Sequence, residues 1–312
     1  MIGPERGHHR EKVERFVAAA QTAEREGFAS VWFPQVPDDF DALTAIALMG
    51  QATERIELGT AVVPIQTRHP VAMAQQALST QAVCGGRLTL GLGPSHHWIV
   101  EDMLGLSYDR PAHQVRTYLE VLNAALDGPG PVDVENDGYR VHNPLDITDI
   151  VPTPILLAAL APVMLGIAGA HASGTILWMA DERAIGDHVV PRLTKAAADA
   201  GRSAPRVVAG VPVALCGNDE VDDARRWANR ALGHADYSPN YQRLLDHGDA
   251  TDVGDILAGG DEAAIVERLG RFREAGVTDL AVRVLPLGAD REARIESWNR
   301  TEAFVSSLCP EF

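Results

Sequence analysis

The sequence predicts an α/β fold of the (β/α)8 TIM-barrel class, in which a closed parallel sheet is surrounded by helices. Apolar runs typical of strands alternate with amphipathic helical runs along most of the 312 residues, and this alternation is the pattern of helical crossovers between parallel strands. Two of the apolar runs, Ile56–Val63 and Leu88–Leu92, end in small and polar residues, as strands do at the chemical face of a barrel. Because a typical single barrel needs roughly 250 residues, we expect one domain, residues 1–312, with insertions.

The N-terminal part predicts a truncated first strand followed by three further strands. Met1-Ile2-Gly3-Pro4 is too short for a full strand, yet the long amphipathic helix Arg10–Glu26 that follows resembles the second half of a βα unit, and Gly27 ends it. Pro70 suits the first turn of another helix. The elements expected next are strand Phe28–Phe33, helix Asp41–Gln51, strand Ile56–Val63, helix Val71–Val83, strand Leu88–Leu92 and helix Pro111–Leu126.

The C-terminal part predicts four more strands and two insertions. Residues Asp127–Pro154 are rich in Pro, Gly and Asp with one β-like run at Tyr139–His142, so we expect an insertion over one face and a candidate lid. Gly233–Gly260 is a second irregular insertion. The expected elements are strand Ile155–Leu160, helix Pro162–His171, strand Thr175–Met179, helix Ile185–Ala200, strand Arg206–Leu215, helix Glu220–Leu232, helix Asp261–Ala275, strand Leu280–Leu285 and helix Arg291–Leu308. The resulting eight strands, with the stub at Ile2 included, favour a closed barrel over an open doubly wound sheet.

The composition is that of an ordinary globular protein with an acidic surface. The formal net charge of −16 argues against nucleic acid or an anionic membrane as partner, because both need clustered Lys and Arg. Cys84, Cys216 and Cys309 are far apart and form no CxxC pair, which favours reduced thiols in a cytoplasm. No apolar run approaches the length of about 18 residues that a membrane span needs. We therefore expect a cytoplasmic protein that acts on a small molecule.

The residues at the expected carboxyl ends of the strands favour a planar organic cofactor over a metal. They are mostly small and apolar, and they lack both the paired carboxylates of a glycosidase and a set of metal ligands. His96 and His97 are adjacent, without the i, i+4 spacing of a helical metal site, so we expect no metal. Gly91-Leu92-Gly93 begins like a dinucleotide-binding fingerprint, but His96 stands where the third glycine belongs, so we reject that interpretation.

Six runs together carry a resemblance to a known family: GFASVWFPQ, RIELGTAVVP, HPVAMAQQALSTQAVCGGRLTLGLG, LGLSYDRP, PILLAALAPVMLGIAG and AGVTDLAVR. In this order and spacing they resemble the bacterial luciferase-like monooxygenase superfamily, and most of all its branch of oxidoreductases that use 8-hydroxy-5-deazaflavin, coenzyme F420. The resemblance covers nearly the whole chain. It implies a TIM barrel that is often a homodimer, with a flavin or deazaflavin at the ends of the strands.

The resemblance also implies where the cofactor would lie. Its tricyclic ring would rest on a bulge in the third strand, which commonly holds a non-prolyl cis peptide and corresponds here to Ala61-Val62. Residues Ala159–Val163 would line the ring or its tail, and Arg283 would meet the phosphate, unless Arg283 simply pairs with an acidic residue. Trp178 fits the wall of a cleft and the packed core about equally well. The residues expected to bind the cofactor are Thr60, Ala61, Val62, Val63, Gly93, Ala159, Ala161, Pro162, Val163, Trp178 and Arg283.

Three departures from the family pattern restrict the function. Sugar-phosphate dehydrogenases of the superfamily carry Asp-His and Glu where this chain has Gln35-Val36 and His96, which argues against sugar-phosphate oxidation. Those enzymes grip the coenzyme phosphate with a Lys where this chain has Asp181, so FMN stays open beside F420 as the cofactor. His96 and Gln35 are the candidate catalytic proton donors, although His96 also fits a structural role in its loop.

The leading hypothesis is an F420-dependent oxidoreductase that transfers a hydride between the reduced deazaflavin and a small organic substrate of the unsaturated or carbonyl type. One alternative is an FMN-dependent monooxygenase that uses oxygen. Another is a non-catalytic flavin-binding barrel, which the truncated first strand and the missing Lys favour. The small residues of helix Val71–Val83 predict close packing against a second copy of the chain.

Overall fold

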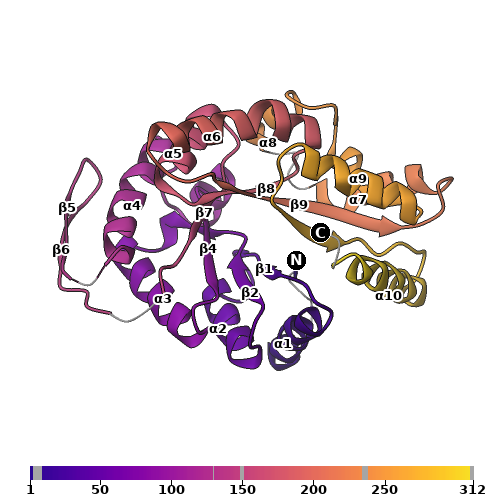
Figure 1. The fold of residues 1–312 in the computed structure, drawn as a ribbon, viewed down its shortest axis with the longest axis horizontal. Helices are drawn as coiled ribbons and strands as arrows, with labels where there is room; N and C mark the ends of the chain where they lie inside the picture. The colour runs from indigo at the N-terminus through magenta and orange to yellow at the C-terminus, as the bar shows by residue number, and fades with distance from the viewer. Residues whose placement is uncertain (3–8, 129, 148–150, 234–237, 310–312) are drawn as a thin grey trace.

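The computed structural model describes residues 1–2, 9–128, 130–147, 151–233 and 238–309, and a curled parallel sheet lies at its centre with helices on the outside (Figure 1). The strands follow the order β1-β2-β4-β7-β8-β9, β11 also pairs with β9, and all of these pairings are parallel. The α/β barrel that the sequence predicts is therefore confirmed. The strands are β1 (Ser30–Phe33), β2 (Glu57–Thr60), β4 (Leu88–Gly93), β7 (Ile155–Leu157), β8 (Gly174–Trp178), β9 (Arg206–Leu215) and β11 (Asp279–Val284).

Side-chain caps and prolines fix where many of the helices begin. Asp41, Asp261 and Asp290 each accept a hydrogen bond from the backbone N–H three residues later, which satisfies one of the unpaired donors of a helix start. Proline occupies the first position of α3, α4 and α5, where its missing N–H costs nothing. The helices between the strands are α1 (His9–Arg25), α2 (Ala42–Ala52), α3 (Pro70–Val83), α4 (Pro111–Leu126), α5 (Pro162–His171), α6 (Val190–Asp199), α7 (Val221–Leu232), α9 (Glu262–Glu274) and α10 (Arg291–Ser307).

The interior of the curled sheet holds a small apolar cluster of its own. Its buried members come from five different strands, and Met1, Ala61 and Val62 pack on them. Gly59 of β2 has to be glycine, because a Cβ there would lie 2.2 Å from the Trp32 ring. The cluster fills the barrel between its two ends and consists of Trp32, Leu156, Ile176, Val208 and Ala281.

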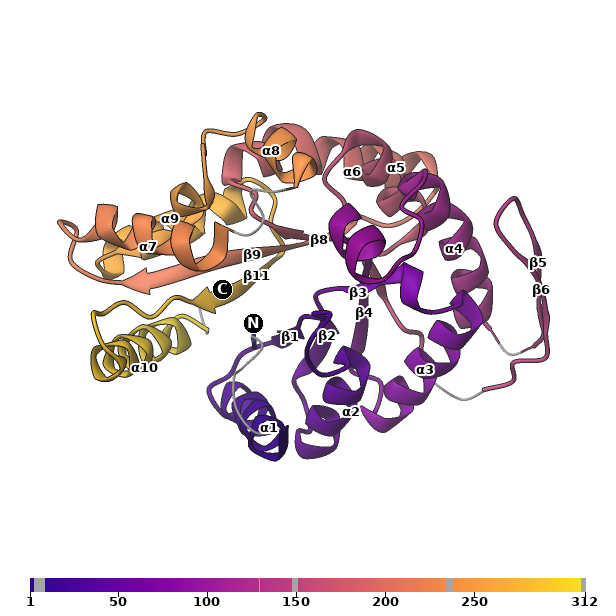
Figure 2. The ribbon, with the colours of Figure 1, turned by 180° about the vertical axis from the view of Figure 1, so that it is seen from behind.

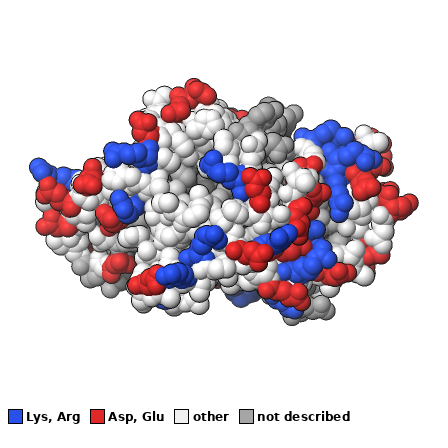
Figure 3. Space-filling view, turned by 90° about the horizontal axis from the view of Figure 1, so that it is seen from above, with Lys and Arg blue, Asp and Glu red and all other residues white. Residues whose placement is uncertain are grey.

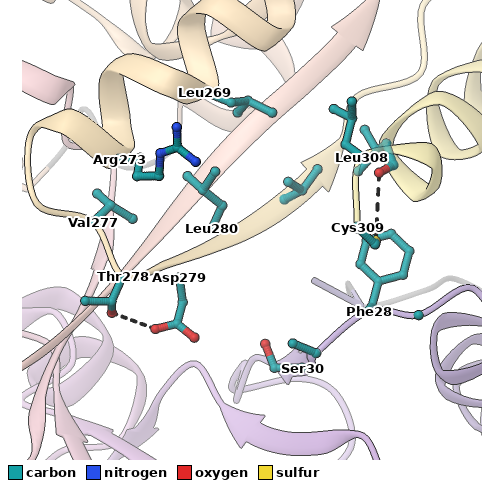
Figure 4. Close-up of a pocket in the computed structure, with 14 residues that line it drawn as sticks. Phe28, Ser30, Leu269, Arg273, Val277, Thr278, Asp279, Leu280, Leu308 and Cys309 are labelled. Carbon is teal, nitrogen blue, oxygen red and sulfur yellow. Dashed lines mark hydrogen bonds between the residues drawn. The ribbon is translucent and has the colours of Figure 1, made fainter. Parts of the chain in front are cut away.

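Residues 1–2 lie in a gap between β1 and β11, two strands that do not pair directly within the described part of the chain. The Met1 nitrogen donates a hydrogen bond to the Val282 carbonyl (2.7 Å), and the Ile2 N–H donates one to the Trp32 carbonyl (3.0 Å). These bonds connect residues 1–2 to β11 and β1; Gly3 and Pro4 lie outside the described residues. At the other end of the same gap, a cleft of about 170 Å³ opens between Phe28–Ser30 and residues 277–280 (Figure 4).

An arginine joins the strands around this gap at the amino-terminal end of the barrel. Arg206, the first residue of β9, donates hydrogen bonds to both carboxylate oxygens of Glu57 on β2 (2.6 and 3.0 Å) and of Asp279 on β11 (2.8 and 2.5 Å). Burial raises the pKa of Asp279, but the hydrogen bonds from Arg206 and Thr278 outweigh it, so that pKa lies below its ordinary value. The Glu57–Arg206–Asp279 cluster therefore links three strands where direct strand pairing is interrupted.

The structure divides one predicted strand and finds elements in the second insertion. Ile56–Val63 is broken at Ala61-Val62, which is a cis peptide bond as the resemblance implied, so that β2 ends at Thr60 and a short β3 (Val63–Pro64) follows. Residues 233–260 contain helix α8 (Pro239–Leu245), a 3₁₀ turn at Val253–Ile256 and β10 (Ala258–Gly260), which pairs with the end of β9. These elements were missed because each is too short to show a periodicity.

The first insertion is not the lid that the sequence suggested. It forms an antiparallel hairpin of β5 (Val132–Glu135) and β6 (Arg140–Asn143) that lies on the outer side of α4 in both views (Figures 1 and 2). The run at Tyr139–His142 was correctly placed as β, but its alternation does not say which face of the molecule it covers. The expectation of a lid at Asp127–Pro154 is therefore wrong.

Charged side chains of both signs cover the surface. Lys and Arg are interspersed with Asp and Glu over the face shown in Figure 3, as expected for an acidic globular chain. Within the described ranges, no helix has the length and the apolar character to cross a membrane.

Replacing Arg206 by Gln should destabilise the fold by about 2–3 kcal/mol, because Glu57 and Asp279 would be left facing each other partly buried and without a positive charge. Urea denaturation at pH 7 measures this loss. The matched control is Arg140→Gln, which breaks an exposed pair with Glu135 and should cost at most about 0.5 kcal/mol.

The same variant should respond differently to acid. An acid whose folded pKa is lowered contributes stability above its unfolded pKa, and that contribution disappears as the pH falls through the folded pKa. The difference in unfolding free energy between wild type and Arg206→Gln should therefore shrink as the pH is lowered through the acidic range in which Asp279 protonates. If Arg206→Gln and Arg140→Gln lowered the free energy of unfolding equally at pH 7, this would contradict a stabilising role of the Glu57–Arg206–Asp279 cluster.

Candidate active site

A cavity of about 480 Å³ opens at the carboxyl ends of the strands. Its walls come from residues that follow β1, β2, β4, β7, β8 and β11, together with residues of α8. The volume lies within the range of about 300–1,000 Å³ that is usual for cofactor and small-molecule sites. No described residue of 127–154 is among its walls.

The cavity brings together most of the residues that the sequence singled out. Those that line it are Gln35, Ala61, Val62, Gly93, His96, Ala161, Val163, Trp178 and Arg283. Four others do not line it: Thr60, Val63 and Ala159 are buried in the protein, and Pro162 is exposed at the start of α5. Instead of Ala159, its neighbours Ala158 and Leu160 face the cavity.

Thr60 supports the cavity from behind. Its hydroxyl donates to the Gly91 carbonyl and accepts from the Gly91 N–H, both at 2.8 Å, so it ties the end of β2 to β4. A Cβ at Gly91 would lie 1.9 Å from the Thr60 carbonyl oxygen, so this close approach requires glycine. The chain bends at Ala61-Val62, directly after the two hydrogen bonds between Thr60 and Gly91.

Small residues form one wall of the cavity, which we call the floor: Ala61, Val62, Gly93 and Ala158. Gly93 leaves open the space between the other members, because a Cβ there would lie 2.9 Å from Val62 Cγ2 and 3.2 Å from Ala158 Cβ. No side chain on the floor is larger than valine. A wall of this kind suits contact with the face of a planar ring.

Arg283 brings a positive charge into the cavity. Its guanidinium carbon lies 5.8 Å from the centre of the Trp178 ring, and among the described residues no carboxylate forms an ion pair with it. Burial lowers the pKa of Arg283, which reflects the poor hydration of this charge. Because no Asp or Glu is among the described residues that line the cavity, the guanidinium is free to bind an anionic group of a ligand.

Two candidate proton donors lie in the cavity in different situations. The side-chain oxygen of Gln35 accepts a hydrogen bond from the Ala42 N–H (2.8 Å), which leaves its NH₂ group for the cavity. His96 is stacked on Trp98, with ring centres 5.8 Å apart at 14°. Burial, and then the neighbouring His97, lowers the pKa of His96. An amide releases no proton near neutral pH, so His96 is the better acid of the two.

Sequence reasoning named no residue of the second insertion as part of the cavity. Ser238, Asn240 and Tyr241 line it, and a usable signal was the Ser-Pro pair that starts α8. Asp181, which stands where relatives were expected to have Lys, does not line the cavity. Its buried carboxylate accepts hydrogen bonds from the backbone N–H groups of Ala184, Asp249 and Ala250 (2.6–2.7 Å).

Among the residues that the structure describes, no group of three or more His, Cys, Asp or Glu side chains is arranged to hold a metal ion.

Two curated relatives resemble the chain in sequence. A putative coenzyme F420-dependent oxidoreductase of Mycobacterium tuberculosis is 33% identical over 158 residues, which is 49% of this chain and 44% of that protein. The chain thus spans less than half the length of that relative. A 5,10-methylenetetrahydromethanopterin reductase of Methanopyrus kandleri is 24% identical over 92% of this chain and 93% of its own length.

Solved structures resemble the chain in fold. An F420-dependent secondary alcohol dehydrogenase in complex with an F420-acetone adduct has a TM-score of 0.75 at 16% identity and covers 97% of both chains. The oxygenating constituent of 3,6-diketocamphane monooxygenase of Pseudomonas putida, in complex with FMN, has a TM-score of 0.73 at 16% identity, over 98% of this chain and 94% of that one.

A family model described as luciferase-like monooxygenase matches residues 2–279, which include every strand of the curled sheet up to the start of β11. The match contains the whole floor of the cavity as well as His96 and α8. The chain therefore belongs to the luciferase-like monooxygenase family, and it is an oxidoreductase.

Proposed function

We propose that the protein is an F420-dependent oxidoreductase that transfers a hydride between the reduced deazaflavin and a small organic substrate. The observation that carries this proposal is the floor of Ala61, Val62, Gly93 and Ala158, which offers a planar ring an unobstructed surface in the same cavity as the Arg283 guanidinium. The sequence similarity to an F420-dependent oxidoreductase and to a methanopterin reductase supports F420 as the cofactor.

The residues present fit such a cofactor. The floor would contact the face of the ring, Ala161 and Val163 would border the ring or its tail, and Arg283 would bind the phosphate. When bound, the deazaflavin supplies the carbon that gives or takes the hydride. The protein binds and orients both partners and excludes water with its apolar walls.

His96 would be the group that moves a proton. In the reductive direction the substrate gains a hydride, that is two electrons and one hydrogen, and a proton completes the product. His96 lines the cavity and can deliver that proton, while the NH₂ group of Gln35 can donate a hydrogen bond to orient the substrate.

Two alternatives keep specific support. An FMN-dependent monooxygenase that uses oxygen would bind the same floor and phosphate group, and a structural neighbour holds FMN. A non-catalytic flavin-binding barrel is favoured by Asp181 at the position expected to hold a Lys, but the cavity is open beside the floor, which leaves room for a substrate and supports an enzyme.

We also propose that the protein acts in the cytoplasm as a homodimer. Cys84 and Cys216 are buried free thiols, and Cys309 is a free thiol as well, as expected for a reducing compartment. Ala72 and Ser79 of α3 are exposed, and small residues there would let a second copy approach closely.

Titration with oxidised F420 should quench tryptophan fluorescence with saturable binding, and FMN should bind more weakly. Arg283→Met should weaken F420 binding by about 10- to 100-fold, because a charge-assisted contact to phosphate would be lost. The control Arg300→Met, on the exposed side of α10, should leave binding unchanged. Tight FMN binding without F420 binding would favour the monooxygenase alternative.

His96→Gln should lower the rate of the reductive reaction about 100-fold or more at pH 6. The wild-type rate should fall as the pH rises through the pKa of His96, which lies below that of an ordinary histidine, because the protonated form is the better acid. The variant should lose this pH dependence. Steady-state rates across pH 5–8 with one substrate test both, and an unchanged profile in the variant would remove His96 from the reaction.

Sedimentation velocity at micromolar concentration should show a single species of twice the chain mass. A large charged substitution on the outward face of α3, Ala72→Arg, should shift the protein toward monomer while leaving its circular dichroism unchanged. A wild-type protein that sediments only as a monomer would contradict the homodimer.

A further inference from the structure

Helix α8 is held against the barrel at its C-terminal side. The carboxylate of Asp181, at the end of β8, accepts hydrogen bonds from the N–H groups of Asp249 (2.6 Å) and Ala250 (2.7 Å). His247, two residues after α8, stacks on His188 with ring centres 3.9 Å apart. Residues that follow α8 are thus fixed to the segment between β8 and α6, so the side chains of α8 face the cavity from a defined position.

Tyr241 of α8 and His96 are in contact and both line the cavity. Their ring centres are 5.8 Å apart at 39°. His96 comes from the loop after β4 and Tyr241 from the second insertion, so two distant segments bring these rings together at the cavity. Burial raises the pKa of Tyr241 to about 12, so its hydroxyl keeps its proton at neutral pH.

No hydrogen bond joins the Tyr241 hydroxyl or the His96 ring to any residue that the structure describes. This distinguishes Tyr241 from Tyr108, another tyrosine of the same cavity, whose hydroxyl donates to the Ser95 carbonyl (3.0 Å). Because the cavity is mostly apolar and no described Asp or Glu lines it, no carboxylate there can accept a hydrogen bond from Tyr241 or His96. Donors without partners in an apolar site are costly unless a ligand supplies the acceptor.

We propose that Tyr241 and His96 together bind the oxygen of an uncharged carbonyl substrate, with Tyr241 as the second donor. This rests on the proposed function, since the deazaflavin on the floor would face the substrate held there. The substrate class is then a neutral, mostly apolar ketone or aldehyde. Anionic acids are disfavoured, because Arg283 is assigned to the cofactor, and so are amines, because no described carboxylate lines the cavity.

The chemical step balances with these groups. The reduced deazaflavin would supply the hydride for the new C–H bond at the carbonyl carbon, and it would itself be oxidised by two electrons. The π pair of the C=O bond would move to the oxygen, which would take a proton from His96. The carbonyl would thus become an alcohol, and water would reprotonate His96. Tyr241 keeps its proton and stabilises the charge that develops on the oxygen.

Cyclohexanone is a suitable probe, and methylenecyclohexane, which has the same shape but no acceptor oxygen, is its control. Protein labelled with 3-fluorotyrosine is titrated without cofactor and followed by ¹⁹F NMR, and the Tyr241 signal is identified by its absence from Tyr241→Phe. We expect cyclohexanone to shift this signal saturably and methylenecyclohexane not to. The Tyr241→Phe variant is followed at the signal of Tyr108, which also lines the cavity. It should bind cyclohexanone about five- to tenfold more weakly than the wild type.

Tyr118→Phe is the matched control. Its hydroxyl also lacks a partner among the described residues, but it is buried in α4 and does not line the cavity, so affinity for cyclohexanone should not change. Equal affinity of Tyr241→Phe and wild type, or equal shifts with both probes, would overturn the proposal. Because these titrations contain no deazaflavin, they report on the carbonyl site alone, whereas failure of F420 binding in its own titration would overturn the proposed function.

Discussion

The double hydrogen bond between Thr60 and Gly91 is the interaction on which the site depends. It holds the end of β2 against β4 at a separation that only glycine allows, and the chain turns at Ala61-Val62 immediately afterwards. As a result, Ala61 and Val62 lie beside Gly93 on the floor of the cavity. A bulkier residue at Gly91 would separate the strands, and the floor would lose its shape.

Stability and chemistry lie at opposite ends of the barrel. At the amino-terminal end, Arg206 connects β2, β9 and β11 by charge, beside the cleft between β1 and β11. At the carboxyl end, the floor consists of small side chains, and Arg283, His96 and Tyr241 offer polar groups that a ligand can satisfy. The barrel can tolerate small and polar side chains around the cavity because the Glu57–Arg206–Asp279 cluster and the apolar cluster around Trp32 hold the strands in place.

The sequence revealed the order of strands and helices because periodicity and caps are local signals, and the resemblance located the cis bond at Ala61-Val62. It could not decide which of Ala158, Ala159 and Leu160 faces the cavity, because neighbouring residues of an extended chain point to opposite sides and a shift by one residue reverses them. Contacts between distant segments were also out of reach. Arg206 and Glu57 are 149 positions apart, and Tyr241 belongs to a helix of seven residues in a stretch without periodicity.

A crystal structure of the protein with oxidised F420 tests the central claim most directly. The account predicts the tricyclic ring lying flat on Ala61, Val62 and Gly93, with the phosphate within hydrogen-bonding distance of Arg283. A ring bound elsewhere, or side chains that occupy the space over Gly93 and leave no room for it, would contradict the account.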